Sequence, residues 1–381
     1  MQIDFSNFFI AVSIVQAIVL SVFLLLPDNI KRTSNQLLVI ILVSIAAEYA
    51  ELFIYGTGTT IKHPNYAYLG TLLSVIQPPA IYLYTKSLMY RDFKIKTRHA
   101  FLLLPFFIAI LVFSFSYYIQ PIEIKREIIL KQDLPGMPTS LWLAVAIHSL
   151  FLFYLGFAIR SLNKFAASVK AIFSDIENKQ ITWLRLLLTG YVFIWVISLA
   201  YCLSFYIFKH AAETKHVLIF AGISGFIFIN TLVIYALKQP VIFSGLTEEE
   251  SAIIEDDTTT SEIINLPSSE QIGRLESLMD TQKPYLNSNL TINKLAAQSG
   301  IPTRELSFII NQGFGKNFFD FICDYRINYA KALLEKTSEK RAILEIMYDA
   351  GFNSKSVFNT AFKQKTGLTP SQYRNTAQKG S

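Results

Sequence analysis

Two glutamates and a histidine fall within long apolar stretches of this sequence. Glu48 and Glu51 are three positions apart, so both would lie on one face of a helix, and His148 stands in a later stretch. Ionisable groups in such surroundings typically mark a ligand site or a proton relay. We therefore expect Glu48, Glu51 and His148 to belong to a sensing pocket. The competing interpretation is a hydrogen-bonded packing role, above all for His148, and a position at a helix end would weaken the case for Glu51.

The remaining sequence holds no pattern typical of catalysis or metal binding. Cys202 and Cys323 have a spacing that matches no metal site. The topology argued below places them in different compartments, so we expect two packed thiols rather than a disulfide. The apolar part carries no metal-ligand cluster and no nucleotide-binding loop. We expect no catalytic residue, no metal, no cofactor and no enzymatic activity.

Long apolar segments must position the three ionisable residues. The chain has 381 residues, of which 52% are hydrophobic and only 16% charged, and the apolar ones are concentrated before about position 240. A membrane-spanning helix needs about 20 mostly apolar residues. Seven segments meet this need: about Phe5–Leu26, Gln36–Tyr55, Tyr68–Met89, Ala100–Ile119, Ser140–Leu162, Trp183–Phe208 and His216–Leu237. Pro78-Pro79 and Pro105 leave the bounds of the third and fourth segments open.

The loop charges indicate how such spans would be oriented. The first segment lacks the basic start and the small-residue cleavage site of a signal peptide, so we expect a retained span. With the N-terminus outside, ten Lys and Arg residues fall in inner loops and six in outer loops. Seven spans would then place the C-terminal part of the chain in the cytoplasm.

The composition changes after the last apolar segment. Residues 241–270 contain eight acidic residues and no basic one, a net charge of −8. Low hydrophobicity with charge of one sign favours a flexible chain, which at this length would span roughly 30 Å. The sequence therefore predicts a membrane domain over residues 1–240, an acidic linker over 241–270 and a separate domain over 271–381.

The last domain begins with a helix-turn-helix pattern at about residues 291–312. Thr291 can cap a short helix, and Gly300 can supply the left-handed turn that ends it. Thr303 can then cap a second helix that turns Leu306 inward. From residue 271 onward fifteen Lys and Arg outnumber nine Asp and Glu, a net charge of +6 that suits a phosphate-facing surface.

A second copy of the pattern follows at about residues 343–366. The turn is Gly351-Phe352, and Asn353 or Ser354 can cap the next helix. Between the copies, residues 317–334 predict a helix that is too apolar on one side to stand free, so it must pack on both. The whole chain is predicted to be all-α: a seven-helix transmembrane bundle followed by a double helix-turn-helix domain.

Leu290 to Arg374 resembles the DNA-binding domain of the AraC/XylS family, and the likeness covers about residues 271–375. Two stretches carry it, AGFNSKSVFNTAFK at residues 350–363 and GLTPSQYR at residues 367–374. The resemblance implies seven helices, with two helix-turn-helix units joined by a linker helix. It also implies that the second helix of each unit enters the major groove, in successive turns on one face of the DNA.

The resemblance further implies which side chains face DNA. They are Arg304, Ser307, Phe308 and Asn311 in the first recognition helix and Lys355, Ser356, Asn359 and Thr360 in the second. Arg and Lys favour guanine edges, and Asn favours adenine. Phe308 departs from the polar or basic residue usual in the family, and would either contact a thymine methyl group or pack inward. Lys316, Lys363 and Arg374 are expected at phosphates or in the fold rather than at bases.

Together these features predict a membrane-bound one-component transcriptional regulator in a bacterial inner (cytoplasmic) membrane. Its expected partners are promoter DNA, the lipid bilayer and a small-molecule, peptide or protein signal. RNA polymerase joins them if the protein is an activator, and a homodimer would form through the membrane domain or on DNA. Two alternatives stay open. One is a transporter or membrane enzyme whose cytosolic domain is regulatory, and the other is a C-terminal domain that has become a protein-docking module.

Overall fold

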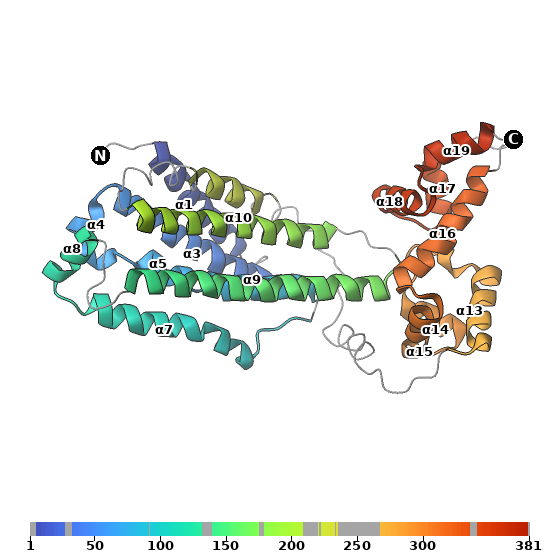
Figure 1. Cartoon of the computed structure of the whole chain (residues 1–381), viewed down its shortest axis with the longest axis horizontal. Helices are drawn as coiled ribbons and strands as arrows, with labels where there is room; N and C mark the ends of the chain where they lie inside the picture. Colours follow the sequence, from blue (N-terminus) through green and yellow to red (C-terminus); the bar gives the residue numbers. More distant parts are fainter. Residues whose placement is uncertain are drawn as a thin grey trace. The chain divides into compact units, whose positions relative to one another are not determined.

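The structure of the protein is a computed structural model that describes residues 5–26, 33–90, 92–131, 139–174, 179–208, 220, 222–232, 234, 267–335 and 341–379 (Figure 1). Most of the predicted linker, residues 241–266, lies outside these residues. The chain divides into two compact units: residues 1–162 with 181–247 form unit 1, and residues 163–180 with 248–381 form unit 2. The all-α prediction is confirmed, since the described residues contain helices and one isolated bridge, between Phe173 and Thr291, but no strand.

Unit 1 consists of apolar helices and short connecting turns. Its elements are α1 (Phe5–Leu24), α3 (Thr33–Gly56), α4 (Thr59–Lys62), η1 (Pro64–Tyr66), α5 (Leu69–Ser74), α6 (Gln77–Met89), η2 (Thr97–Leu103), α7 (Leu104–Phe113), the π-helix η3 (Ser114–Tyr118), α8 (Ile122–Lys131), the first part of α9 (Thr139–Ile172), α10 (Lys179–Phe208) and a helix over Gly222–Leu232. Within the described residues, four helical stretches are long and apolar enough to cross a membrane: Asn7–Leu24, Thr33–Gly56, Thr97–Tyr118 and Leu143–Ile172.

The prolines of unit 1 stand at helix starts. The third predicted segment is two helices, α5 and α6, and Pro78-Pro79 occupies the first turn of α6. Pro105 likewise occupies the first turn of α7. Proline is favoured there because its missing N–H group would have no partner within the helix in any case. The apolar run from Tyr68 to Met89 is therefore broken before Gln77.

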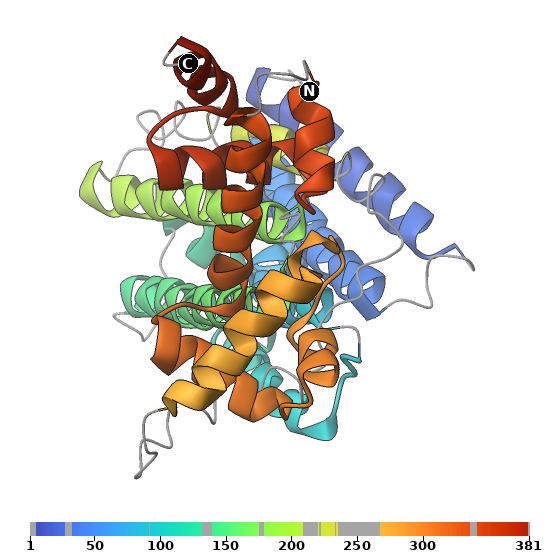
Figure 2. The same ribbon diagram turned by 90° about the vertical axis from the view of Figure 1, so that its right-hand side faces the viewer.

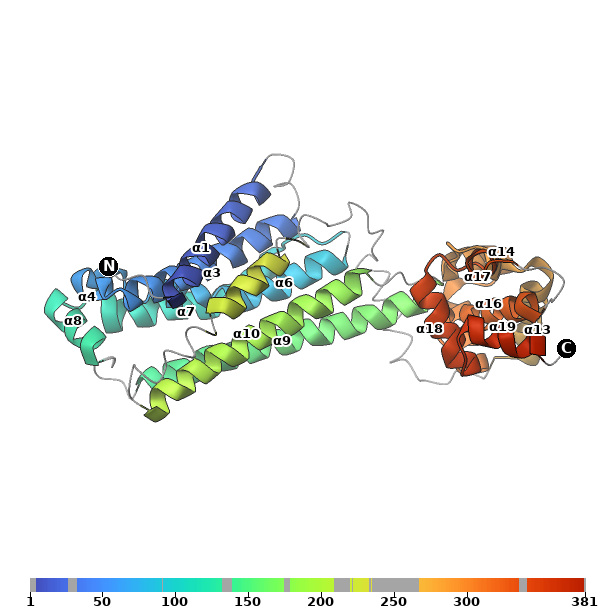
Figure 3. The same ribbon diagram turned by 90° about the horizontal axis from the view of Figure 1, so that it is seen from above.

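Helix α3 is the centre of unit 1. It contacts α1, α4, α5 and α6, and its buried residues Leu38, Ile41, Leu42 and Ile45 recur every three or four positions. Gly70 lets α5 lie directly on α3, because a Cβ atom at this position would stand 2.5 Å from the main-chain oxygen of Ala47. Helices α9 and α10 run side by side (Figure 3) and meet through the stacked rings of Phe151 and Tyr191.

Unit 2 contains seven α-helices in its described residues after position 267. They are α13 (Ser269–Gln282), α14 (Ile292–Ser299), α15 (Thr303–Phe308), α16 (Phe318–Glu335), α17 (Ile343–Asp349), α18 (Lys355–Thr366) and α19 (Pro370–Lys379), with the short turns η4 (Pro284–Leu286) and the π-helix η5 (Ile309–Gly313). Helix α16 contacts η4 and η5 as well as α17, α18 and α19. Figure 2 shows the orange helices of the first motif and the red helices of the second separated along α16.

One apolar core fixes the second motif on α16. It consists of the buried residues Cys323, Ile327, Ala330, Leu334, Ile346, Met347, Ala350, Phe352, Phe358 and Phe362. Burying a large apolar side chain stabilises a fold by about 1.5–3 kcal/mol relative to leaving it exposed. The three phenylalanines form a chain of ring contacts, with centroids 5.2 Å apart for Phe352 and Phe358 and 5.6 Å apart for Phe358 and Phe362. The second recognition helix is therefore held on its inner side by aromatic packing.

Candidate nucleic-acid interface

The first motif begins as the local sequence predicts. The Thr291 hydroxyl accepts a bond from the main-chain N–H of Lys294 at 3.3 Å, which caps α14. Gly300 ends that helix with φ of 69°. The prediction for Thr303 is wrong. Pro302 takes the capping position of α15, and the Thr303 hydroxyl donates to Asn293 Oδ1 instead, at 3.1 Å, because Thr303 is already the first residue of the helix.

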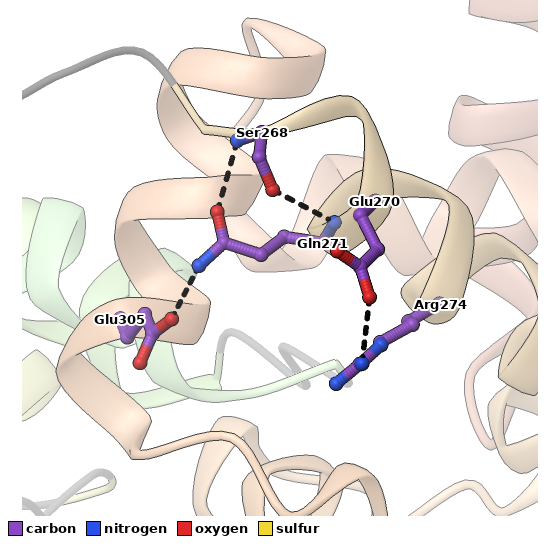
Figure 4. A network of polar contacts seen from close by, with 5 residues as sticks. All are labelled: Ser268, Glu270, Gln271, Arg274 and Glu305. Carbon is purple, nitrogen blue, oxygen red and sulfur yellow. Dashed lines mark hydrogen bonds and ion pairs between the residues drawn. The ribbon is translucent and has the colours of Figure 1, made fainter.

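A polar network at the start of α13 positions α15 (Figure 4). Ser268 and Gln271 form a reciprocal capping box, in which each side chain accepts a bond from the main-chain N–H of the other. The Gln271 side chain also donates to Glu305 Oε1 at 2.6 Å. Glu270 pairs with Arg274 beside this network. The same residue that caps α13 thus ties it to the first recognition helix.

The four residues expected on the first recognition helix lie in different surroundings. Arg304 and Asn311 are exposed, Phe308 is half-buried, and Ser307 is only 9% exposed. Asn311 donates to the Ser307 hydroxyl at 3.4 Å. Helix α15 is six residues long and continues as a wider π-helix over Ile309–Gly313. Asn311 therefore lies on π-helical backbone, which changes its register relative to Arg304.

The second motif turns at a glycine that no other residue could replace without strain. Gly351 has φ of 85°, and a Cβ atom there would stand 2.5 Å from the main-chain oxygen of Tyr285. Ser354 takes the capping position of α18 but makes no side-chain capping bond. Helix α18 is 12 residues long and regular, and its inner face carries Phe358 and Phe362.

The outer face of α18 brings the predicted second set of residues together. Lys355, Ser356 and Thr360 are exposed, and Asn359 is half-buried. Lys355, Asn359 and Thr360 border a groove of about 840 Å³, which is also lined by Leu344 from α17, Lys363 from α18 and Ser371 from α19, among others. Donors, acceptors and cations of α18 thus share one open surface, which is the chemistry that base edges and phosphates require.

The three residues expected at phosphates differ in their partners. Lys363 is exposed on the groove. Lys316 pairs with Asp324 of α16 at 2.5 Å, and Lys365 of α18 pairs with the other oxygen of the same carboxylate, also at 2.5 Å. The buried Nη2 of Arg374 has no hydrogen-bond partner among the described residues. Lys316 is therefore engaged in joining the loop before α16 to α18, through Asp324.

The sequence places Tyr373 in the core, as the structure does, but it does not reveal two polar contacts that hold the second motif. Arg326 of α16 is fully buried. It stands in a stretch whose apolar residues predict a packed helix, so the sequence pattern does not single it out. Tyr373 donates to Glu335 Oε1 at 2.5 Å, and this bond, with burial, raises the pKa of Tyr373 to about 12. The Tyr373 ring packs on Phe362, so this residue joins the second motif to the end of α16 through both its ring and its hydroxyl.

The predicted sensing residues of unit 1 separate into three environments. The Glu51 carboxylate accepts bonds from the main-chain N–H groups of Tyr68 (3.0 Å) and Thr71 (2.7 Å), at the start of α5. Glu48 accepts from the Gln77 side chain at 3.0 Å, and the Gln77 oxygen accepts from the Tyr191 hydroxyl at 3.3 Å. His148 lies against the ring of Trp195, with centroids 6.0 Å apart. Glu48 and Glu51 remain neighbours on α3 with different hydrogen-bond partners, whereas the contacts described for His148 are with Trp195.

Comparison with known proteins supports the reading of unit 2. Residues 295–376 match a family model described as a helix-turn-helix domain. "Transcriptional activator RhrA" of Rhizobium meliloti is 28% identical over 106 residues, 28% of this chain and 33% of that protein. "Melibiose operon regulatory protein" of Escherichia coli is 34% identical over 89 residues, 23% of this chain and 29% of that protein.

A solved structure is similar to part of this chain. The C-terminal domain of the two-component response regulator yesN from Fusobacterium nucleatum is 27% identical and covers 28% of this chain and 99% of that chain, with a TM-score of 0.25. The present chain spans about a third of the length of the two curated relatives. The C-terminal part of this chain is a helix-turn-helix domain of the AraC type.

Proposed function

We propose that this protein is a membrane-anchored, one-component transcriptional regulator that binds promoter DNA through α15 and α18. The observation that carries the proposal is the outer face of α18, where Lys355, Thr360 and Lys363 are exposed on an open groove in a domain of the AraC type. A helix of this kind fits the major groove of B-DNA, and its side chains suit guanine, adenine and phosphate contacts.

The two motifs would contribute unequally to sequence recognition. Helix α18 is regular over 12 residues, whereas α15 has six residues and passes into a π-helix. Arg304 and Asn311 are the exposed candidates on the first motif, because Ser307 is buried and Phe308 is half-buried. We infer that α18 sets most of the sequence preference, and that α15 contributes through Arg304 and Asn311.

The apolar surface of unit 1 supports anchoring in a bilayer. Among the described residues, the large hydrophobic side chains that are exposed lie almost all in unit 1, with examples at Phe101 (79%), Phe115 (67%) and Val19 (62%). In unit 2 they are Leu344 and Tyr348. Exposed apolar area on this scale is costly in water and favourable against lipid chains.

The loop charges support an orientation with the N-terminus outside and unit 2 in the cytoplasm of a bacterium. Ten basic residues in the predicted inner loops against six in the outer ones follow the positive-inside rule. This orientation also puts the DNA-binding domain in the compartment that holds DNA. The loop charges and the position of the DNA-binding domain therefore support the same orientation.

The polar chain Glu48–Gln77–Tyr191 is the best candidate for sensing. It links α3, α6 and α10 inside the apolar unit, so a ligand or a proton at Glu48 would alter contacts between three helices. Glu51 serves a different role in this proposal, because its carboxylate caps α5. The signal in this proposal is a small molecule, a peptide or a protein.

Mapping of bound DNA across the genome tests the proposed function. The full-length chain and a chain beginning at residue 267 would each be expressed, and their bound sites compared, with membrane fractionation in parallel. We expect the full-length chain in the membrane fraction and at a limited set of promoters. A full-length chain that enriches no DNA site would refute the regulator, and one that is recovered outside membranes would refute the anchor.

A further inference from the structure

A buried arginine in the middle of α16 contacts the turn before the first motif and the turn of the second. Arg326 has no exposed surface, and its Nε donates to the main-chain oxygen of Tyr285 at 2.7 Å. Its Nη2 donates to the main-chain oxygen of Asn287 at 2.9 Å. The guanidinium also lies over the ring of Phe352, 5.5 Å from the centroid. Tyr285 and Asn287 directly precede the first motif, and Phe352 belongs to the second, so one side chain joins the turn before the first motif to the second motif.

Ser174, which lies far earlier in the chain, also contacts Arg326. Arg326 Nη1 donates to the main-chain oxygen of Ser174 at 2.6 Å, and Nη2 donates to the Ser174 hydroxyl at 2.9 Å. Ser174 in turn donates to the main-chain oxygen of Leu290, from its hydroxyl at 2.6 Å and from its N–H at 3.2 Å. Phe173 forms an antiparallel bridge with Thr291, the residue that caps α14.

The contact lies directly after α9. This helix is continuous from Thr139 to Ile172, a length of about 50 Å at 1.5 Å per residue. Its residues 163–172 belong to unit 2, and Phe165, Val169 and Ile172 among them are buried. Ser174 follows two residues later and is fully buried. Because the backbone is continuous, a shift or rotation of α9 is transmitted to Ser174.

We propose that Phe173 and Ser174, docked on Leu290, Thr291 and Arg326, form the contact through which α9 controls DNA binding; this rests on the proposed function. Docked, Ser174 holds the Arg326 guanidinium, which in turn holds the Tyr285–Asn287 turn and Phe352. The two motifs then keep one relative arrangement, as a site on two successive turns of DNA requires. Withdrawal of Ser174 breaks two bonds to a charged group and two to Leu290, and loosens that arrangement.

Three variants of the full-length chain in lipid nanodiscs test the contact. Ser174→Ala removes the hydroxyl and keeps both main-chain bonds. Ser174→Leu places a larger side chain at a fully buried position, so residues 173–174 should no longer dock on Leu290, Thr291 and Arg326. Ala167→Leu adds the same side chain at an exposed position of α9 and is the matched control. The readouts are hydrogen exchange at residues 285–291 and 351–358 without DNA, and the Kd for the preferred DNA site.

We expect faster exchange in both segments for Ser174→Ala and more so for Ser174→Leu, with unchanged protection in the middle of α16. The Kd should rise by about 5- to 150-fold in Ser174→Leu, the usual range for coupling between two sites. Ala167→Leu should match the wild type in both readouts.

Unchanged exchange in both Ser174 variants would overturn the proposed contact, and so would a Kd that is unchanged or lower. The exchange readout needs no DNA, so it decides the contact even if the wild type binds none. A wild type that binds no specific DNA refutes the proposed function separately.

Discussion

Gly351 lies against the main-chain oxygen of Tyr285, so closely that a Cβ atom at position 351 would stand 2.5 Å from it. Tyr285 comes from the turn before the first motif and Gly351 from the turn of the second. The turn before the first motif and the turn of the second therefore touch through backbone, at the place where Arg326 also contacts Tyr285. This close approach ties the position of one recognition helix to that of the other.

Gly351→Ala should destabilise unit 2 by at least about 2 kcal/mol, because it combines a left-handed backbone with a clash against a main-chain atom. Urea unfolding of the full-length chain in detergent, followed by hydrogen exchange of α18, measures the loss. Gly273→Ala is the matched control: Gly273 lies within α13, with nothing inside 4 Å of an added Cβ. It should raise stability by about 0.5–1 kcal/mol. Equal behaviour of the two variants would contradict the close approach.

Lys355→Ala with Asn359→Ala should relax the sequence preference at one half of the DNA site, because these side chains share the outer face of α18. Each lost base contact is expected to reduce discrimination by about 1–3 kcal/mol. Lys363→Ala should instead weaken binding to all sequences alike and reduce the salt dependence, as expected for a phosphate contact. Footprints and selected sequences of the variants check both. A double variant that keeps the wild-type preference would remove α18 as the reader.

Glu51→Gln and Glu48→Gln should have different effects. Glutamine at position 51 keeps one oxygen for the N–H groups of Tyr68 and Thr71 and turns its own N–H group toward the other donor, which weakens the cap of α5 at a cost of about 1–3 kcal/mol. The amount of folded protein in the membrane should fall. An amide at position 48 still pairs with Gln77, so protein level should stay normal while the response to the signal changes. Immunoblotting and a promoter reporter separate the two; equal levels and a normal response in both would end the sensing proposal.

Deleting Glu248–Asp257 should tighten non-specific DNA binding at low salt. Residues 241–270 carry a net charge of −8 and residues 271–381 a net charge of +6, so the acidic segment competes with phosphates for the basic surface. The effect should fade as salt rises and charges are screened. Titration of random-sequence DNA at two salt concentrations measures it, and a deletion variant indistinguishable from wild type at low salt would contradict the competition.

The local parts of the double motif could be predicted from sequence because each depends on a few neighbouring residues. The Thr291 hydroxyl caps α14, and Gly300 and Gly351 supply left-handed turns at their own positions, as predicted. Thr303 was mispredicted because Pro302, one residue earlier, also fits the start of a helix. No residue type distinguishes the π-helix after Phe308 from an α-helix, so the sequence pattern predicts a regular helix there.

Contacts between distant segments could not be predicted. The bonds from Arg326 to Ser174 join residues 152 positions apart, and neither residue stands out in its own surroundings. Glu51 accepts hydrogen bonds from N–H groups at the start of α5, and this helix start exists because the predicted third span is broken into α5 and α6. The sequence pattern does not show that break, so it predicts a sensing role for Glu51. The pairing of Lys316 and Lys365 on Asp324 depends in the same way on how α16 and α18 pack.

Selection of DNA from a random pool by the full-length chain in nanodiscs tests the central claim most directly. The account predicts enrichment of one sequence with two half-sites about 10–10.5 base pairs apart, the spacing of successive major grooves on one face. It also predicts that the half read by α18 is the more strongly specified. A pool that stays random after repeated selection, while the chain remains folded, would contradict the claim that this protein reads DNA.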